Sequence, residues 1–499
     1  MRDSPGGRKG AQSPQGGTPP GRKGSESPGG GTNVNIVSNS VPGATIHEAA
    51  SPHQAGVQRL VRSYAAVPPG ATVRLAKKSS NLFRARDATA APGLDVSGLT
   101  GVLRVDVPAR TADVAGMCTY EDLVAATLPL GLSPLVVPQL KTITLGGAVT
   151  GLGIESASFR NGLPHESVLE LDVLTGTGDI ITATPDNEHA ALFSSFPNSY
   201  GTLGYATRLR IELEPVAPYV ALRHVRFHDL DELTATVAAV TAARTFDGAR
   251  VDYLDGVVFS AAESYLTMGM LTEEAGPTSD YTGQQIYYLS LRQRSTDRLS
   301  IGDYLWRWDT DWFWCSGAFG AQHPVIRRVW PKRLRRSSVY SKIIAMDARY
   351  RVADRIEERH GRPPRERVVQ DVEVPVERTA EFLRWFLATV PIDPIWLCPV
   401  RLRGERTWDL YPMTPDRTYV NVGFWSSVAQ QPGQPGATNR LIEQQVTAMD
   451  GHKSLYSDSY YPPEEFAARY GGARYDAVKA QYDPTSRLLD LYAKAVRKK

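Results

Sequence analysis

The sequence predicts an α+β protein with two domains. Its 499 residues are enough to bury two separate cores. Segments with strand-like alternation of apolar residues occur among segments whose apolar residues recur at helical spacing. The most distinctive stretch, residues 144–156, holds four glycines within eight positions of an apolar run. Glycine costs conformational entropy on folding, so the run indicates a backbone that lies against a ligand or, equally well, a buried turn.

The segments ahead of the glycine-rich run predict one helix, two strands and a second helix. Residues 53–65 place Val57, Leu60, Val61 and Tyr64 on one helical face. The strands are expected at 71–76 and 101–107, and the second helix is expected at 122–130, ending at Gly131.

After the run, residues 168–174 and 180–183 predict a hairpin around a turn at 176–179. A second region begins near Pro215, and Asp229 opens a helix that reaches Arg244. Residues 427–438 read as a loop. The remaining strands are expected at 252–259, 286–291, 396–403 and 419–425, and the remaining helices at 378–389, 439–449 and within 463–497.

The glycine-rich run, the hairpin and the Gly201 to Gly204 segment, in this order, resemble the flavin-binding domain of the vanillyl-alcohol-oxidase/PCMH superfamily. The spacing matches neither G-x-G-x-x-G nor a P-loop. A narrower resemblance spans roughly residues 60 to 495. It rests on segments 151–158, 312–314, 369–371, 395–399 and 455–460, which are similar to the Δ24-sterol reductase (Diminuto/seladin) family and to bacterial 10-methylene fatty acyl reductases.

The resemblance implies four parts of the chain. Residues 1–45 form a low-complexity tail, which we expect to be disordered. Residues 46–217 form a PCMH-type FAD-binding domain of two αβ subdomains, and residues 218–450 form an α+β substrate or cap domain. Residues 451–499 return to the active site and end as a helix.

The resemblance also implies FAD as cofactor, reduced by NADPH. The loop that corresponds to the diphosphate-binding loop of this superfamily has no histidine, so we expect the FAD to be held non-covalently. Its ammonium, hydroxyl and amide groups suit a diphosphate, although the loop could also be a solvated basic turn. The loop consists of Lys77, Lys78, Ser79, Ser80 and Asn81.

Backbone N–H groups of the glycine-rich run are expected to contact O4 and N5 of the flavin ring, where they would stabilise negative charge. These groups belong to Gly146, Gly147, Ala148, Gly151 and Gly153. Further candidates for cofactor contacts are Thr142, Ser156, Ile180, Ile181, Gly201 and Gly204. No metal site is expected, because the three cysteines lie far apart in the sequence.

Reduction of an isolated C=C bond needs a proton as well as a hydride, so a positioned acid is required. In a strand, Tyr456, Asp458 and Tyr460 would share one face. We select Tyr456 or Asp458 as the proton donor, and Glu155 as a further candidate that follows the glycine-rich run. Ordinary packing of the tyrosines, and a salt bridge from Glu155 to Arg160, are the alternatives.

The aromatic stretch 304–314 contains four of the nine tryptophans and is followed by a basic cluster at 327–336. It predicts either core packing or an element at the headgroup level of a membrane, with Trp312 and Trp314 at the interface. The second interpretation implies a peripheral membrane contact that gives access to lipid.

The function expected from these features is FAD-dependent, NADPH-driven reduction of an isolated C=C bond in a lipid. The Ala- and Arg-rich, lysine-poor composition and the lack of an N-terminal anchor look bacterial. They favour a methylene-branched fatty acyl chain of a phospholipid, reduced from 10-methylene to 10-methyl after a methyltransferase has acted. The alternatives are a Δ24-sterol reductase-type activity, an FAD-dependent oxidase of an alcohol or sugar, and a lipid-binding scaffold without flavin.

Charge and hydropathy limit the partners. The net charge is only +3, and beyond residue 33 the basic and acidic residues are equal in number, which argues against nucleic acid. No apolar run reaches 18 residues, so no membrane-spanning helix is expected. Three scattered cysteines suit a reducing compartment. We therefore expect a cytoplasmic protein, peripheral at the inner face of the membrane if lipid is its substrate.

Overall fold

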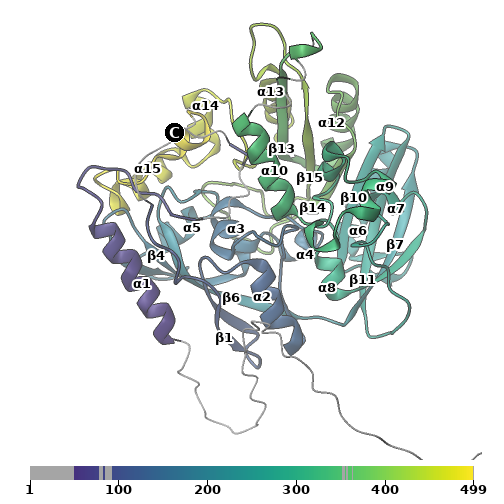
Figure 1. The fold of residues 1–499 in the computed structure, drawn as a ribbon. Helices are drawn as coiled ribbons and strands as arrows, with labels where there is room; N and C mark the ends of the chain where they lie inside the picture. The colour runs from purple at the N-terminus through teal and green to yellow at the C-terminus, as the bar shows by residue number, and fades with distance from the viewer. Residues whose placement is uncertain are drawn as a thin grey trace, which may run out of the picture. The chain divides into compact units, whose positions relative to one another are not determined.

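The computed structural model describes residues 50–77, 83–84, 93–350, 355, 358–361 and 363–497 (Figure 1). These residues all lie in one compact unit. The predicted tail at 1–45 and the loop residues Lys78, Ser79, Ser80 and Asn81 lie outside the described part of the chain.

The first half of the chain forms a six-stranded antiparallel sheet. Its strand order is β1-β2-β6-β4-β5, and β3 pairs with β6. The strands are β1 (Val102–Asp106), β2 (Thr111–Ala115), β3 (Leu132–Pro134), β4 (Val168–Leu174), β5 (Ile180–Ala183) and β6 (Tyr205–Pro215).

Local capping signals fix the helices around this sheet. The Thr119 hydroxyl accepts a hydrogen bond from the backbone N–H of Asp122 and so starts α2. Gly131, with a φ of 71°, ends the following 3-10 turn in the left-handed conformation that glycine favours. The helices are α1 (Ala50–Ala65), α2 (Tyr120–Thr127), η1 (Leu128–Leu130), α3 (Leu145–Gly151), α4 (Ser158–Asn161), η2 (Pro164–Ser167) and α5 (Ala190–Ser195).

The second half forms an eight-stranded antiparallel sheet of order β12-β7-β11-β10-β14-β15-β13-β16. The chain passes from one sheet to the other between the end of β6 and the start of β7. The strands are β7 (Tyr219–Phe227), β10 (Tyr253–Ser260), β11 (Glu263–Thr272), β12 (Thr296–Ser300), β13 (Arg365–Pro375), β14 (Ile395–Val400), β15 (Tyr419–Ala429) and β16 (His452–Lys453); a small hairpin joins β8 (Thr245–Phe246) to β9 (Ala249–Arg250).

The two faces of the eight-stranded sheet have different partners. On β13, Val372 and Val374 pack into a core with α6 (Leu230–Ala243), α12 (Val376–Thr389) and α13 (Ala437–Ala448). These helices cover one face of the sheet (Figure 1). Because side chains alternate along a strand, the intervening residues face the other way. That opposite face carries the side chains described below.

The C-terminal segment packs back onto the first half of the chain. Lys479 Nζ donates to the Thr202 carbonyl at 2.8 Å, and Lys494 Nζ donates to the Tyr200 carbonyl at 2.6 Å. The remaining helices are α7 (Tyr287–Ser290), α8 (Ile301–Leu305), η3 (Cys315–Phe319), α9 (Pro324–Val329), η4 (Lys332–Leu334), α10 (Ser337–Tyr350), α14 (Pro463–Arg469), α15 (Gly472–Tyr482) and α16 (Leu491–Ala495).

Two predicted strands are wrong. Residues 71–76 contain only an isolated bridge, from Leu75 to Leu94. Residues 286–291 form the short helix α7, because Tyr287 packs edge-on against Trp308 and tertiary contact overrides strand propensity. The other expected elements are confirmed to within a few residues, and the α+β class is confirmed.

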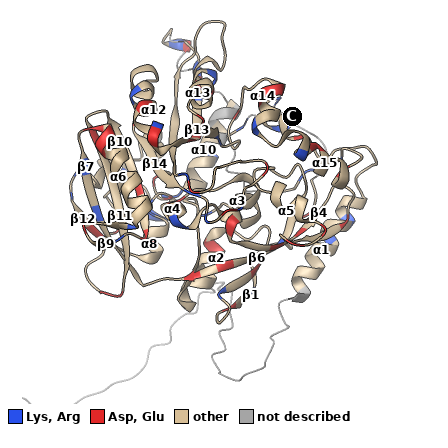
Figure 2. Ribbon diagram, turned by 180° about the vertical axis from the view of Figure 1, so that it is seen from behind, with Lys and Arg blue, Asp and Glu red and all other residues tan. Residues whose placement is uncertain are grey.

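Charges of both signs are scattered over both sheets and their helices (Figure 2). Within the described residues, no helix has both the length and the apolar character needed to cross a bilayer.

Candidate functional site

A cavity lies where α3, the aromatic stretch and the second face of the eight-stranded sheet, opposite the helices, meet. The cavity and its mouth together hold about 1100 Å³ of empty space. The lining includes Lys77, Phe83, Pro138, Thr142, Gly147, Ala148, Gly151, Leu152, Gly153, Tyr200, Trp312, Phe313, Asp371, Trp396, Trp425, Ser454 and Tyr456. Four of the five predicted N–H contacts to the flavin ring therefore line this cavity. Thr142, the first lysine of the predicted diphosphate loop and one predicted proton donor line it as well.

The glycine-rich run is helical where it meets the cavity. Thr144 caps α3 through its hydroxyl, which accepts from the Gly147 N–H at 3.2 Å. The Gly146 N–H donates to the Gly116 carbonyl at 3.0 Å, and the Ala148 N–H donates to the Thr144 carbonyl at 2.8 Å. The predicted role of these three N–H groups as flavin donors is therefore wrong, because the protein's own oxygen atoms already bind them.

The glycines instead let the cavity wall come close to its neighbours. A Cβ atom on Gly153 would lie 2.9 Å from Cγ of Pro138, and one on Gly151 would lie 3.1 Å from the Tyr200 ring. The result is a wall of backbone and small side chains with almost no protruding groups. Such a wall fits one face of a flat aromatic ring system, so the residues present fit the flavin ring.

Four non-glycine residues of the cavity lining have left-handed backbone. They are Leu152, Tyr200, Trp312 and Phe313, with φ values of 60°, 51°, 45° and 58°. Each such conformation costs of order 1–3 kcal/mol and persists only where the surroundings enforce it. Strain of this kind concentrates at functional sites, which supports the assignment of the cavity as one.

Asp371 and Tyr456, both half-buried, form a proton-bearing pair on the opposite wall of the cavity. Their side chains share a hydrogen bond, and Trp425 Nε1 donates to the Tyr456 hydroxyl at 2.9 Å. Burial raises the pKa of Asp371 to about 7, so its carboxyl keeps a proton near neutrality. Burial also raises the pKa of Tyr456 well above its usual value.

The register between β13 and β15 determines the position of the Asp371 side chain. Asp371 on β13 lies opposite Gly423 on β15, and Asn421 Nδ2 donates to the Asp371 carboxyl at 3.3 Å. A Cβ atom on Gly423 would lie 2.4 Å from that carboxyl. Glycine at 423 thus leaves the space that the Asp371 side chain occupies. In the sequence, Asp371 stands out only as part of the matching segment 369–371, which does not indicate a role for its side chain.

The aromatic stretch is part of the cavity wall, and its interpretation as a membrane element is wrong. Trp312 and Phe313 line the cavity, and the Phe313 ring stacks on Trp425 with centroids 4.2 Å apart. Only 2% of Trp308 and 5% of Trp312 is exposed. Trp314 is buried as well, so these rings cannot reach a lipid headgroup.

Glu155 does not face the cavity. Its carboxylate is buried and accepts from Arg307 Nη2 at 2.6 Å, while the expected partner Arg160 pairs with Glu214. Arg307 Nη2 also donates to Asp255 at 2.8 Å. The predicted catalytic role of Glu155 is therefore not supported, because its carboxylate belongs to a buried ion cluster behind the wall.

The predicted shared face of Tyr456, Asp458 and Tyr460 does not form. The segment turns at Tyr456, which alone of the three lines the cavity. The Asp458 carbonyl accepts from Lys453 Nζ, and Arg440 lies over the Tyr460 ring. Tyr456 is thus the one of the predicted donors that the structure places in the site.

The remaining cofactor candidates lie away from the cavity lining. The Ser156 hydroxyl is bonded to that of Tyr304 at 2.9 Å. Ile180 and Ile181 lie on the edge strand β5. Gly201 and Gly204 have φ values of 75° and 143°, in a turn that packs against the first sheet. Contacts of these five residues with the cofactor stay predictions.

Comparison with known proteins identifies an FAD-binding domain in this chain. The FAD binding domain family model matches residues 53–184. The chain is 24% identical to the Delta(24)-sterol reductase of Homo sapiens over 80% of its own length and 77% of the relative's. It is also 24% identical to the Delta(24)-sterol reductase of Arabidopsis thaliana, over 81% of its own length and 76% of the relative's. Cytokinin dehydrogenase 7 of Oryza sativa subsp. japonica is 32% identical over 44% of this chain and 42% of its own.

The protein is therefore an FAD-linked oxidoreductase of the PCMH-type superfamily, and its similarity extends through the second half of the chain to Delta(24)-sterol reductases.

Proposed function

We propose that this protein reduces an isolated C=C bond in a lipid, with FAD as the resident cofactor. The observation that supports this most strongly is the Asp371–Tyr456 pair facing the glycine-lined wall across one apolar, aromatic cavity. Reduction of such a bond needs a proton from one side and a hydride from the other. FAD, when bound and reduced, supplies the hydride chemistry.

The residues that would hold FAD are those of the glycine-lined wall and Lys77. Gly147, Gly151 and Gly153 present the flat wall, and Lys77 brings a positive charge to the cavity. An ammonium group can neutralise a diphosphate, and the sequence continues with further polar residues.

The hydrogen bonds of Asp371 and Tyr456 indicate the route by which the proton reaches the substrate. The Tyr456 O–H bond breaks as its proton adds to one alkene carbon, and the electron pair of the C=C bond forms the new C–H bond. Asp371 returns a proton to the Tyr456 oxygen atom and is left as a carboxylate, which solvent reprotonates. The Trp425 N–H stabilises negative charge on the phenol oxygen, because it already donates to that atom.

The substrate that we favour is a methylene-branched fatty acyl chain in a phospholipid, with NADPH as electron donor. Its 1,1-disubstituted alkene poses the same chemical problem as the Δ24 bond of a sterol. The Ala- and Arg-rich, lysine-poor composition favours a bacterial lipid over a sterol. We propose that a methyltransferase acts before this enzyme and makes the methylene branch.

The experiment that tests this function compares three substrates. Purified protein is supplied with NADPH and a 10-methylene phospholipid, a Δ24-sterol or a simple alcohol, and products are identified by mass spectrometry. The 10-methyl product supports the proposal, and a saturated sterol side chain supports sterol reductase activity. Peroxide release with the alcohol and without NADPH would identify an oxidase and contradict the proposal.

FAD is expected to leave the protein when it is denatured. Within the described lining there is no histidine or cysteine to form a covalent bond with the flavin, and the sequence at 77–81 has none either. Acid precipitation followed by absorbance of the pellet and the supernatant measures this. Flavin that stays with the precipitated protein would contradict the prediction.

Turnover is expected to fall as the pH rises through about 7. The pKa of Asp371 is raised to about 7, so the proton needed for the relay is lost above that pH. The free energy of unfolding is expected to fall with rising pH as well, because the pKa of Asp371 is higher in the folded than in the unfolded protein. Its stabilising contribution is therefore complete at low pH and is lost as the pH rises through about 7. Initial rates and urea unfolding between pH 5.5 and 9 measure both effects, and a rate that rises across this range would contradict the relay.

A further inference from the structure

We propose that the outer surface of α9, η4 and the start of α10 docks onto an anionic lipid bilayer. This surface is defined by Val325, Ile326, Arg328, Val329, Arg333, Leu334 and Met346. It lies on a different part of the segment from the buried tryptophans. The inference deepens the proposed function, because a lipid-reducing enzyme must take its substrate from a membrane.

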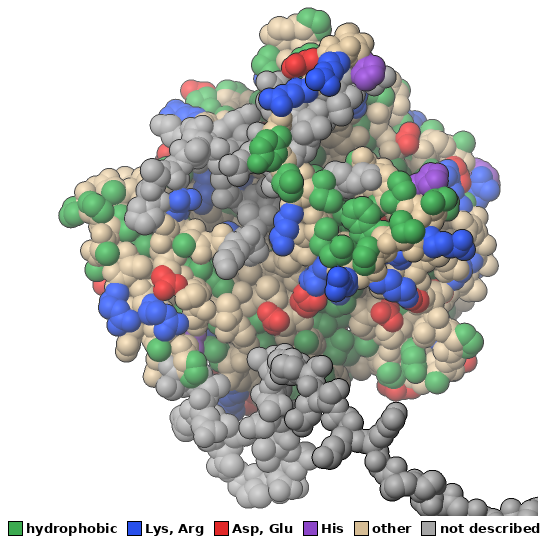
Figure 3. Space-filling view, viewed as in Figure 1, with side chains coloured by type: hydrophobic (Ala, Val, Ile, Leu, Met, Phe, Trp, Pro, Cys, Tyr) green, Lys and Arg blue, Asp and Glu red, His purple; other side chains and the backbone are tan. Residues whose placement is uncertain are grey.

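The apolar side chains of this surface are unusually exposed. Val325, Val329 and Met346 are 67%, 75% and 61% exposed. Of eleven large hydrophobic residues that are exposed in the described part of the chain, six lie between Val325 and Tyr350. Figure 3 shows hydrophobic side chains gathered on this face, with Lys and Arg side chains at their border. A clustered apolar patch of this kind marks a binding surface, whereas single exposed apolar residues do not.

The same segment carries a strong excess of positive charge. Residues 320–350 contain eight lysines and arginines and one aspartate, in a chain that is otherwise close to neutral. Arg328, Arg333 and Lys342 make no ion pair with any residue that the structure describes. Basic residues close to an anionic bilayer are attracted to its headgroups. Aliphatic side chains beside unpaired cations complement a bilayer with anionic headgroups.

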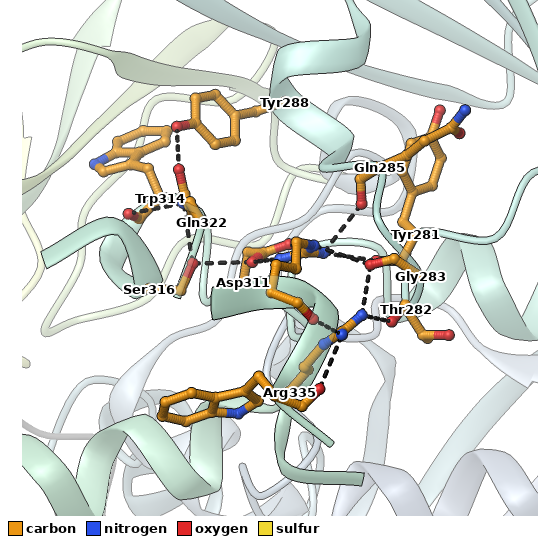
Figure 4. A network of polar contacts seen from close by, with 12 residues as sticks. Tyr281, Thr282, Gly283, Gln285, Tyr288, Asp311, Trp314, Ser316, Gln322 and Arg335 are labelled. Carbon is orange, nitrogen blue, oxygen red and sulfur yellow. Dashed lines mark hydrogen bonds and ion pairs between the residues drawn. The ribbon is translucent and has the colours of Figure 1, made fainter. Parts of the chain in front are cut away.

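Buried arginines hold this surface rigidly against the protein. Arg327 donates to both carboxylate oxygens of Asp311, at 2.6 and 3.0 Å, and to the Gly283 carbonyl at 2.9 Å. Arg335 donates to the carbonyls of Thr282 and Gly283, both at 2.6 Å. Figure 4 shows Arg335 beside Thr282 and Gly283, with Asp311 close to the 281–285 loop. The apolar face of α9 is therefore presented outward by a fixed support.

The same support joins the surface to the cavity. Asp311 directly precedes Trp312 and Phe313, which line the cavity. Its carboxylate also accepts from Ser316 at 2.9 Å, and Gln322 donates to Ser316 at 2.9 Å. Arg327 and Asp311 thus connect the proposed docking surface to the cavity wall, which suits delivery of an acyl chain from the bilayer.

The test is vesicle flotation of the full-length, FAD-loaded protein without substrate. The vesicles are made of phosphatidylcholine alone or with phosphatidylglycerol. We expect binding to the anionic vesicles and weak binding to the neutral ones. Val325→Asp with Val329→Asp is expected to lower partitioning at least about tenfold, because the apolar contact is lost. Arg328→Glu with Arg333→Glu is expected to lower it similarly and to reduce its salt dependence.

A matched control carries two aspartates elsewhere on the surface. Val107 and Leu169 are 43% and 39% exposed. Val107 lies in the turn after β1 and Leu169 lies on β4, so Val107→Asp with Leu169→Asp should leave flotation unchanged. Flavin absorbance and melting temperature verify that each variant is folded.

Three outcomes would overturn the proposal. They are no flotation of the wild type, equal loss in the control, and a change from dimer to monomer in the Val325/Val329 variant by light scattering. The last result would assign the surface to contact between copies of the chain. Because no turnover is measured, failure here leaves the proposed reductase activity to its own test.

Discussion

Tyr456→Phe is expected to lower the rate of double-bond reduction by about two to three orders of magnitude while FAD remains bound. The variant keeps the ring that packs edge-on against Phe83 with centroids 5.9 Å apart, and removes only the hydroxyl that gives up the proton. General acid catalysis typically contributes 10²–10⁴-fold, which sets the scale of the loss. Rapid-mixing measurement should show normal reduction of the flavin by NADPH and slow reoxidation by the lipid.

The Asp371→Asn variant tests whether Asp371 passes its proton through Tyr456 or whether the two residues act independently. The amide keeps the shape of the side chain but cannot return a proton, so we expect a loss of similar size and disappearance of the rate decrease above pH 7. If the proton passes through both residues, the double variant Tyr456→Phe with Asp371→Asn should be no slower than the slower single variant. Tyr460→Phe, which also removes a phenol hydroxyl but lies outside the cavity lining, should have normal activity.

Losses that multiply in the double variant would contradict the relay. Full activity of Tyr456→Phe would instead remove Tyr456 from the chemistry. Unchanged flavin content keeps either outcome interpretable, because it shows that the cavity has formed.

The sequence predicted those parts of the fold that local signals determine. Asp229 caps α6, Gly131 adopts the left-handed conformation that ends η1, and the hairpin of β4 and β5 follows from strand alternation and its turn. Each feature depends on residues within a few positions of one another, so local sequence patterns are enough to predict it.

The site depends on contacts between distant parts of the chain. Asp371 becomes a proton-bearing group only because β13 pairs with β15 and the 454–456 turn folds over it. Glu155 was predicted as a proton donor, with a salt bridge to its near neighbour Arg160 as the alternative. Its partner is Arg307, which lies 152 positions away. No spacing rule in the sequence indicates either pairing.

The burial of the aromatic stretch 304–314 could not be predicted from the sequence either. Tryptophan beside arginine suits a membrane interface when the arginines are solvated. Here Arg307 and Arg327 are buried because Glu155, Asp255 and Asp311 neutralise them. The partners come from other elements, so composition alone could not distinguish a buried ion cluster from a lipid-facing one.

Gly147→Val is expected to abolish FAD binding and leave the protein folded but colourless. Gly147 lies in the first turn of α3 and lines the cavity, and a Cβ atom there would lie 2.8 Å from the Thr144 hydroxyl that caps the helix. The added methyl groups have no room toward the cap, so they project into the space proposed for the flavin ring. Flavin absorbance per protein, with circular dichroism and melting temperature, measures the effect.

Gly404→Val supplies the control for this substitution. Nothing lies within 4 Å of a Cβ atom at that position, and its backbone is not left-handed, so flavin content and folding should match the wild type. Gly147→Ala adds one methyl group and should weaken binding to an intermediate degree, seen as faster loss of FAD on dilution. Full flavin loading of Gly147→Val would place the ring elsewhere. The glycine-rich helix would then serve only packing, which is the reading of the run that the sequence left open.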